Sequence, residues 1–446
     1  MENILGTLFT YLFDIVLWIL PLVGTFLLGF IAWKMWVHYV QQDFISGIDF
    51  VLLEITPPRE VLRSPKAMEL FITNALYHFS YKGGLEEYWQ GAVWFWFSLE
   101  IASIEGQVHF YIRTPTRMKD LIETQMYAQY PQSQVKIVDD YTLAVPEISE
   151  ESGWNLWGCE FKLTKPEAYP IKTYTDFGLD KDPKEEFKVD PISSVIELFG
   201  SIGKGEQMWS QIVITPSKKK YHTKGSHFWQ SPSKRHHDWA EEAEITIRKR
   251  LEEFTGSRAR AEGDPMGGVS KEIRAPAFLD QLVKNATVKM TKLGFDTGIR
   301  VAYVAKKEIF PFGTINNNSR NIRLMFRQYE SPLSNGFSRH NSTQADAYGG
   351  IFLASLKTVN LFKERHLHAY REREFFHLPM RHHLFNQHTI FWPLSMWIKA
   401  YFHPVTFVLN TEELATIWHF PGQILKVPTL ERIESKEASP PTNLPI

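Results

Sequence analysis

The stretch from Ile15 to Trp33, IVLWILPLVGTFLLGFIAW, constrains this chain most, because its nineteen residues carry no charge. A helix of that length is about as long as the ~30 Å hydrocarbon core of a bilayer is thick. Aromatic side chains gather near its ends, as they do at membrane interfaces: Tyr11, Trp18, Trp33, Trp36 and Tyr39. We therefore predict one transmembrane helix, over about residues 12–36, within an N-terminal segment of residues 1–42.

A signal peptide and a helix buried in a soluble core are the alternatives. Glu2 and Asp14 make the start acidic, and no small-residue cleavage site follows, which disfavours a signal peptide. No Lys or Arg precedes the span and Lys34 follows it. The positive-inside rule therefore predicts a single-pass protein of the cell membrane, with its N-terminus outside and its body in the cytoplasm. The single cysteine, Cys159, excludes a disulfide within the chain and suits a reducing compartment.

The chain as a whole has the composition of folded domains. Its 446 residues are 44% hydrophobic and 22% charged, which is typical of two or three globular domains. The net charge of −1 argues against a surface that binds nucleic acid everywhere, so such a role would need a local basic patch.

Residues 47–145 show the pattern β-α-β-β-α-β. The expected elements are a strand at 47–58, a helix at 64–79, strands at 93–103 and 108–115, a helix at 116–130 and a strand at 133–141. That order is typical of a ferredoxin-like domain, an antiparallel sheet with two helices on one face.

A second βαβ-rich domain is expected over residues 155–312, with a basic insertion at 217–237. Its elements are strands at 157–165, 205–217 and 296–310 and helices at 191–202, 238–254 and 276–295. Residues 313–422 are expected to be a helical part rich in aromatic residues and histidine, and residues 423–446 a proline-rich tail. The predicted fold class is α+β: an N-terminal transmembrane helix, two ferredoxin-like domains and a helical C-terminal part.

The stretch NTEELATIWHFPG, residues 410–422, predicts a short and well-defined helix. Asn410 or Thr411 can cap it, and two glutamates in its first turn suit the helix dipole. An apolar stripe follows, made by Leu414, Ile417 and Trp418. After Gly422 the tail has little to bury, so we expect it to become ordered only against a partner.

No residue pattern predicts catalysis or a bound cofactor. GSIGKGEQ at 200–207 lacks the Ser or Thr that follows Lys in a phosphate loop, and it follows a helix where that loop follows a strand. Cys159 is expected to be a small core residue. A histidine-rich segment could hold a metal, but packed or solvated histidines are the favoured interpretation: His366, His368, His377, His382 and His383.

The basic insertion is the weak candidate for binding nucleic acid or anionic lipid. Its cations are Lys218, Lys219, Lys220, Lys224, Lys234 and Arg235. A solvated loop with no ligand is the alternative. Arg371 and Arg373, with Arg381, form a second basic cluster.

Five stretches resemble a family of membrane proteins from bacteria of the candidate phyla radiation. They are LLEITPPREVLRSPKAMELF, SLEIASIEGQVHFYIRTPTRMKDLIETQMYAQYPQSQVKIVDDY, GKGEQMWSQIVI, KLGFDTGIRVAYVAKKEIF and LNTEELATIWHFPG with the tail after it. The resemblance covers most of residues 47–445. In that family this region precedes, or is encoded apart from, a FtsK/HerA-type ATPase akin to those of type IV secretion and conjugation. This sequence stops at Ile446 without a Walker motif.

The resemblance implies a non-catalytic, membrane-anchored scaffold of a type IV secretion-like or DNA-translocation machine. Such a scaffold would form a homo-oligomer and dock a separately encoded, hexameric FtsK/HerA-type ATPase. The alternative is a membrane-tethered nucleic-acid-binding module. The residues expected to bind the partner are Trp418, Phe420, Leu425, Val427, Leu430 and Ile433.

Overall fold

The computed structural model describes most of the chain. The described residues are 2–58, 61, 63–78, 84–149, 151–180, 190–217, 243–249, 252, 277–311, 316–343, 356–377 and 404–422. They fall into two compact units, of which the smaller contains residues 2–49 and 84–94 and the larger contains the rest.

The smaller unit consists of α1 (Glu2–Ser46) and α3 (Gly84–Tyr88). Within Ile19–Ser46 of α1, a stretch of 18 residues has a mean hydropathy of 1.6, and none of the residues in that stretch is buried. By length and composition this helix can cross a membrane. The predicted N-terminal apolar helix is therefore confirmed as a helix.

The larger unit is built on one antiparallel sheet of nine strands. The strands are β1 (Phe50–Thr56), β2 (Phe97–Ile104), β3 (Gln107–Pro115), β4 (Gln134–Val138), β5 (Trp154–Leu163), β6 (Glu206–Pro216), β7 (Gly294–Lys306), β8 (Phe337–Ser342) and β9 (Phe407–Asn410). Their order is β4-β1-β3-β2-β6-β7-β5-β8, and β9 pairs with the start of β7. The predicted α+β class is confirmed.

The strand order repeats within the sheet. Strands β1 to β4 lie in the order fourth, first, third, second, and β5 to β8 have the same order read from the opposite edge. The two sets meet where β2 pairs with β6, from Phe97 opposite Ile214 to Ile104 opposite Gln207. The described strands of both predicted domains therefore share one continuous sheet.

The part predicted as helical, residues 313–422, also supplies strands to this sheet. The short strand β8 pairs with β5, and the four residues of β9 pair with Gly294–Thr297. Both strands are too short to show a clear alternation of apolar and polar residues, which is the pattern that identifies a strand in a sequence.

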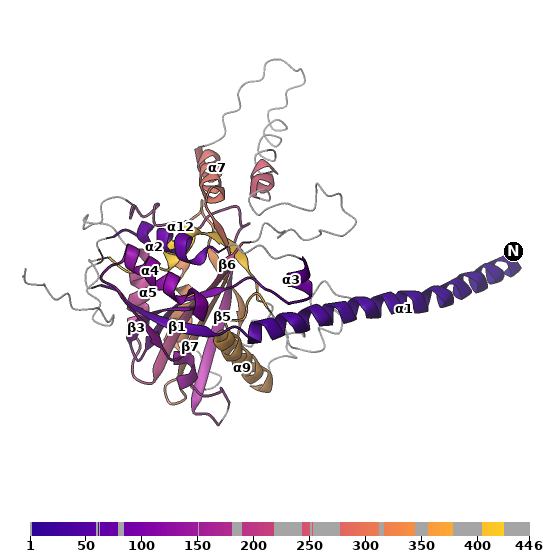
Figure 1. The fold of residues 1–446 in the computed structure, drawn as a ribbon, viewed down its shortest axis with the longest axis horizontal. Helices are drawn as coiled ribbons and strands as arrows, with labels where there is room; N and C mark the ends of the chain where they lie inside the picture. Colours follow the sequence, from indigo (N-terminus) through magenta and orange to yellow (C-terminus); the bar gives the residue numbers. More distant parts are fainter. Residues whose placement is uncertain are drawn as a thin grey trace, which may run out of the picture. The chain divides into compact units, whose positions relative to one another are not determined.

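Four α-helices cover one face of the sheet and lie together in Figure 1: α2 (Lys66–Phe71), α4 (Lys119–Gln129), α5 (Pro191–Gly200) and α12 (Thr411–Ile417). A π-helical turn, Ile72–Leu76, continues α2. The large apolar core lies beneath these helices and includes Phe71, Phe110, Phe199 and Trp418.

The other face carries α9 (Leu356–Glu372) and a 3-10 turn at Tyr141–Ala144. Leu367 and Tyr370 of α9 belong to a smaller apolar cluster with Trp209 and Ala302. The helix seats closely on β5, because a Cβ added to Gly158 would lie 2.2 Å from Nε2 of His366. Further elements are α7 (Ala277–Met290), α8 (Asn317–Asn321) and 3-10 turns at 116–118, 322–324 and 327–329.

Candidate functional site

A row of polar side chains runs across the α9 face of the sheet, from strand to directly paired strand. In order from β4 to β5 it contains Lys136, Glu54, Tyr111, Glu100, Gln211, Arg300 and Glu160. Directly opposite residues of antiparallel strands share a face. The row therefore places seven side chains in one line, and the part from Tyr111 to Glu160 is buried.

Hydrogen bonds join the buried half of this row. Gln211 donates to Glu100 over 3.3 Å and accepts from Arg300 over 3.4 Å. Arg300 donates twice to Oε1 of Glu160, over 3.1 and 2.7 Å. Asn341 of β8 donates to the other oxygen of Glu160 over 2.7 Å. The chain of contacts thus crosses from β2 to β8.

The row holds the C-terminal end of α9. Arg300 donates to the carbonyl oxygens of Ala369 (2.6 Å) and Glu374 (3.0 Å), and Gln211 donates to that of Tyr370 (2.9 Å). The last carbonyls of a helix have no partner within the helix, and they carry its negative dipole end. The buried guanidinium of Arg300 places a positive charge at that end and donates to the carbonyl of Ala369.

Arg373 completes this arrangement from an unusual backbone position. Its φ is +56°, its N–H bonds to the carbonyl of Tyr370, and the N–H of Glu374 bonds to that of Ala369. This is a Schellman motif with Arg373 where glycine is usual. The side chain explains the choice: Nε lies 2.9 Å from Oε1 of Glu100, and Nη1 pairs with Asp140.

The pKa values in this cluster follow from burial and charge. Burial alone would lower the pKa of Arg373, but Glu100 and Asp140 outweigh it and raise the pKa well above its usual value. Burial, with the charge of Glu100 next, raises the pKa of Tyr141 and of Tyr370. Tyr141 donates to Glu100 over 2.8 Å and lies 3.0 Å from the Tyr370 hydroxyl. Both tyrosines are therefore neutral, and Tyr141 donates to the buried carboxylate of Glu100 while Tyr370 contacts the Tyr141 hydroxyl.

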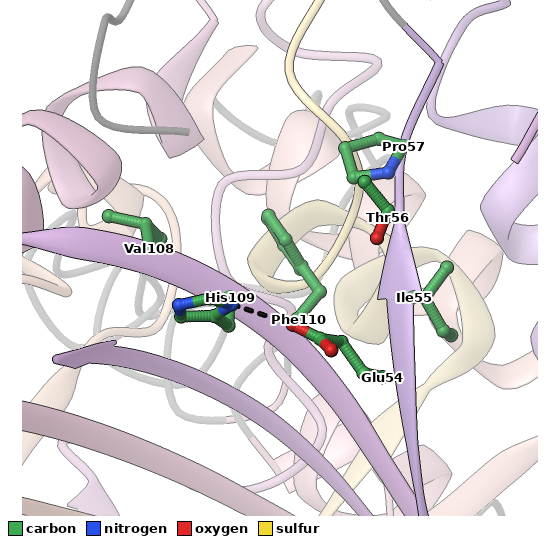
Figure 2. Close-up of a pocket in the computed structure, with 7 residues that line it drawn as sticks. All are labelled: Glu54, Ile55, Thr56, Pro57, Val108, His109 and Phe110. Carbon is green, nitrogen blue, oxygen red and sulfur yellow. Dashed lines mark hydrogen bonds and ion pairs between the residues drawn. The ribbon is translucent and has the colours of Figure 1, made fainter. Parts of the chain in front are cut away.

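Glu54, which lies outside the buried part of the row, borders a small hollow (Figure 2). Oε1 of Glu54 lies 2.6 Å from Nδ1 of His109, and Thr56, Pro57 and Phe110 line the same space. The hydrogen bond from His109 lowers the pKa of Glu54 more than burial raises it. The hollow has a volume of only about 10 Å³, far below the ~300–1,000 Å³ of typical small-molecule sites. We therefore assign it no ligand.

The helix predicted within residues 410–422 forms as α12, Thr411–Ile417, and contacts several other elements. Asn410 caps it: its side chain accepts from the N–H of Glu413, whose carboxylate in turn accepts from the N–H of Asn410. Glu413 also lies 3.0 Å from the buried Lys289 of α7. Lys292 lies 2.7 Å from both Glu412 and Glu69 of α2. The two glutamates thus act as ion-pair partners as well as first-turn charges.

The chain leaves this helix at a fixed point. His419 lies 3.0 Å from Oδ1 of Asp190, and the N–H of Gly422 donates to Oδ2 over 3.5 Å. Asp190 also caps α5 through the N–H of Ile192. Burial alone would raise the pKa of Asp190, but the charge of His419 and these hydrogen bonds outweigh it and lower the pKa. The tail therefore begins from an anchored residue.

Of the six predicted partner-binding residues, two are buried in the structure and four lie outside the described residues. Trp418 and Phe420 are buried and pack edge-on against Phe110. As placed they form core instead of an exposed docking surface, because the apolar stripe of α12 faces inward. Leu425, Val427, Leu430 and Ile433 lie outside the described residues.

The basic candidates divide in the same way. Lys218, Lys219, Lys220, Lys224, Lys234, Arg235 and Arg381 lie outside the described residues. Arg373 is buried and paired, and Arg371 donates to the carbonyls of Thr142 and Val145. The suggested second basic cluster is therefore wrong for Arg373, whose guanidinium has no exposed surface to offer a ligand.

His366 and Cys159 are both core residues. Nε2 of His366 lies 3.0 Å from the carbonyl oxygen of Val301. Burial, then the charge of Arg300, lowers the pKa of His366 to about 3. Cys159 is fully buried, as the sequence predicted. Among the described residues no group of three His, Cys, Asp or Glu side chains is arranged to hold a metal. His382 and His383 lie outside them.

Sequence reasoning missed the polar row and the Glu54–His109 pair. A polar residue inside each apolar strand was visible in the sequence, for example Glu100 in FSLEIASI and Arg300 in GFDTGIRVAYVAK. What was missing is the register that sets them opposite one another, because strand order is not written in the pattern of any single strand.

Residues 96–345 match the domain of unknown function DUF8128. The matched segment begins beside Phe97, the first residue of β2, and ends just after β8. It therefore includes every strand from β2 to β8 and most of the polar row. The comparison with curated proteins found no match.

Proposed function

The chain belongs to the DUF8128 family, whose description assigns no activity, and we propose that it is a non-catalytic scaffold anchored in the cell membrane by α1. The single observation that carries this proposal is the 18-residue apolar stretch within Ile19–Ser46, in which no residue is buried. Exposing so much apolar surface to water is unfavourable, whereas a bilayer accepts it. The body would lie in the cytoplasm, with the N-terminus outside.

The finer description of the body belongs to the same proposal. We take its two halves to be ferredoxin-like units fused edge to edge. The repeated strand order and the antiparallel pairing of every described strand support this. A sheet continued through a β2–β6 seam gives a broad, stiff platform, which suits a part that holds other subunits in place.

The proposed partner is a separately encoded, hexameric FtsK/HerA-type ATPase of a type IV secretion-like or DNA-translocation machine. The resemblance of the sequence supports this partner. The anchored exit of the chain at Asp190, His419 and Gly422 supports residues 423–446 as the docking segment, because a fixed starting point limits the region that the following residues can reach. Leu425, Val427, Leu430 and Ile433 are its apolar candidates, each worth roughly 1.5–3 kcal/mol if buried.

The test is co-purification of the full chain with a FtsK/HerA-type ATPase from the same organism. Truncation after Gly422 should abolish it, and so should replacing Leu425, Val427, Leu430 and Ile433 together by Ser. The matched control replaces Glu431, Glu434 and Glu437, three polar residues of the same tail, by Gln and should keep the ATPase bound.

Two results would contradict the proposal. Full recovery of the ATPase with the truncated chain would remove the tail as the docking element. A salt-dependent shift of DNA by the full chain, abolished by replacing Lys218, Lys219 and Lys220 with Gln, would favour the nucleic-acid-binding module instead.

A further inference from the structure

Aromatic rings of α3 and of the turn after it lie against α1 at and just after the end of its uncharged segment. The ring centroids of Trp33 and Tyr88 are 6.0 Å apart, and those of Trp36 and Trp89 are 5.8 Å apart. Just beyond α3, Gly91 has a φ of +67°, and a Cβ there would lie 2.0 Å from the backbone oxygen of Val40. This close approach fixes α3 beside one particular stretch of α1.

The contact leaves most of these aromatic side chains exposed. Leu85 is 72% exposed and Trp89 is 62% exposed, and Trp33, Trp36, Tyr39 and Tyr88 are also exposed. Leu85, Tyr88 and Trp89 stand at positions i, i+3 and i+4, so they share one face of the turn, while Glu86 and Glu87 lie on the other. An exposed patch of this kind marks an interaction site.

The position of the patch along α1 identifies what covers it. From Asp14 to Trp33 the helix rises about 29 Å, at ~1.5 Å per residue, which matches the ~30 Å hydrocarbon core. From Trp33 to Tyr39 it rises a further ~9 Å, and the headgroup layer on each side is about 5–8 Å thick. The aromatic patch therefore coincides with the headgroup layer whenever the uncharged segment occupies the hydrocarbon.

We propose that α3 and the turn after it form a second membrane-contacting element, whose Leu85, Tyr88 and Trp89 enter the headgroup layer of the bilayer beside residues 33–40 of α1. Tryptophan and tyrosine suit that layer because they combine a large apolar ring with a polar group that remains hydrated. Leucine adds apolar area on the same face. This inference rests on the proposed anchoring by α1 and adds a lipid-facing element that lies outside the apolar helix.

The test uses the full chain in phosphatidylcholine vesicles, with an environment-sensitive fluorophore on a single introduced cysteine. Leu85→Cys probes α3, and Phe26→Cys probes the apolar helix. Leu143→Cys is the matched control, because Leu143 is 68% exposed and belongs to the sheet-bearing unit. The native Cys159 is fully buried, and the labelled wild-type chain gives its background. Lipids carry a nitroxide quencher either near the headgroup or near the end of the acyl chain.

The fluorophore at Leu85 should be quenched several-fold more by the headgroup nitroxide than by the acyl-chain nitroxide. The fluorophore at Phe26 should show the reverse, and that at Leu143 should be quenched by neither. If Leu85 behaves like Leu143 while Phe26 is quenched, the anchor holds and the inference about α3 is wrong. If Phe26 is not quenched either, the anchoring itself fails and takes the inference with it.

Discussion

Arg373 shows how a single residue can serve two needs at once. It occupies the left-handed position that ends α9, where glycine is usual, and its guanidinium pairs with Glu100 and Asp140 in the interior. Glycine would relax the backbone but leave a buried carboxylate without its cation. The ion pair therefore has to outweigh the backbone strain, which is of order 1–3 kcal/mol.

Removing one partner of this pair should therefore be costly. We expect Arg373→Met to destabilise the chain by about 3–5 kcal/mol, because Glu100 is left charged and buried. Arg373→Met combined with Glu100→Gln should recover part of that loss, since the fully buried carboxylate is then removed and only the partly exposed Asp140 loses its cation. The loss of stability is measured for the double variant and for each single variant, Arg373→Met and Glu100→Gln, by thermal melting of the full chain in detergent, followed by near-ultraviolet circular dichroism. A double variant that loses as much as the two single variants together would show that the pair is not coupled.

At the scale of an element, helix α9 is held on the sheet at two places. Its C-terminal carbonyls are held by side chains from the sheet, while its middle rests on β5 at a point where only a hydrogen fits between them. The absence of a side chain at Gly158 is what lets His366 reach the carbonyl of Val301. The helix is thus positioned by both polar contacts and close packing.

Gly158→Ala should disturb this seat. Its Cβ would lie within 2.2–2.9 Å of three His366 ring atoms, and overpacking of this kind costs about 1–3 kcal/mol. Gly203→Ala is the control, because its nearest neighbour, Oε2 of Glu206, is 3.4 Å away. Hydrogen exchange of the α9 amides should accelerate in the first variant and stay near wild type in the second. Equal behaviour of the two would mean that α9 does not depend on the close approach.

The whole molecule combines an apolar helix with a sheet whose strands come from nearly every part of the body. The sequence predicted the regular strands well: 108–115 was expected and Gln107–Pro115 is found. It could not predict the polar row, because Glu100 and Gln211 are separated by 111 positions and Glu100 and Arg373 by 273. It also did not indicate that Trp418 would be buried, since the apolar stripe of a helix looks the same in a sequence whether it faces a core or a partner.

The orientation of the molecule gives the prediction at this scale. If the uncharged segment spans the cell membrane with the body inside, Thr7→Cys should react in intact cells with an impermeant maleimide. Leu143→Cys, on the exposed side of the 3-10 turn at Tyr141–Ala144, should react only after lysis. Burial raises the pKa of the Cys159 thiol, which keeps its background low. Labelling in the opposite pattern would reverse the orientation.

The late position of β9 and α12 in the chain has a consequence for synthesis. Thr411 bonds to Glu69, 342 positions earlier, and Trp418 donates to the carbonyl of Glu100, 318 positions earlier. A ribosome therefore exposes α1 long before the residues that close the core have been made. The apolar helix is free to engage the membrane-insertion machinery during translation, while the unfinished sheet must be kept from aggregating until residues 407–420 emerge. If α1 spans a membrane as proposed, its insertion would precede folding of the body, and chaperones that act on nascent chains would have a long interval in which to affect the yield.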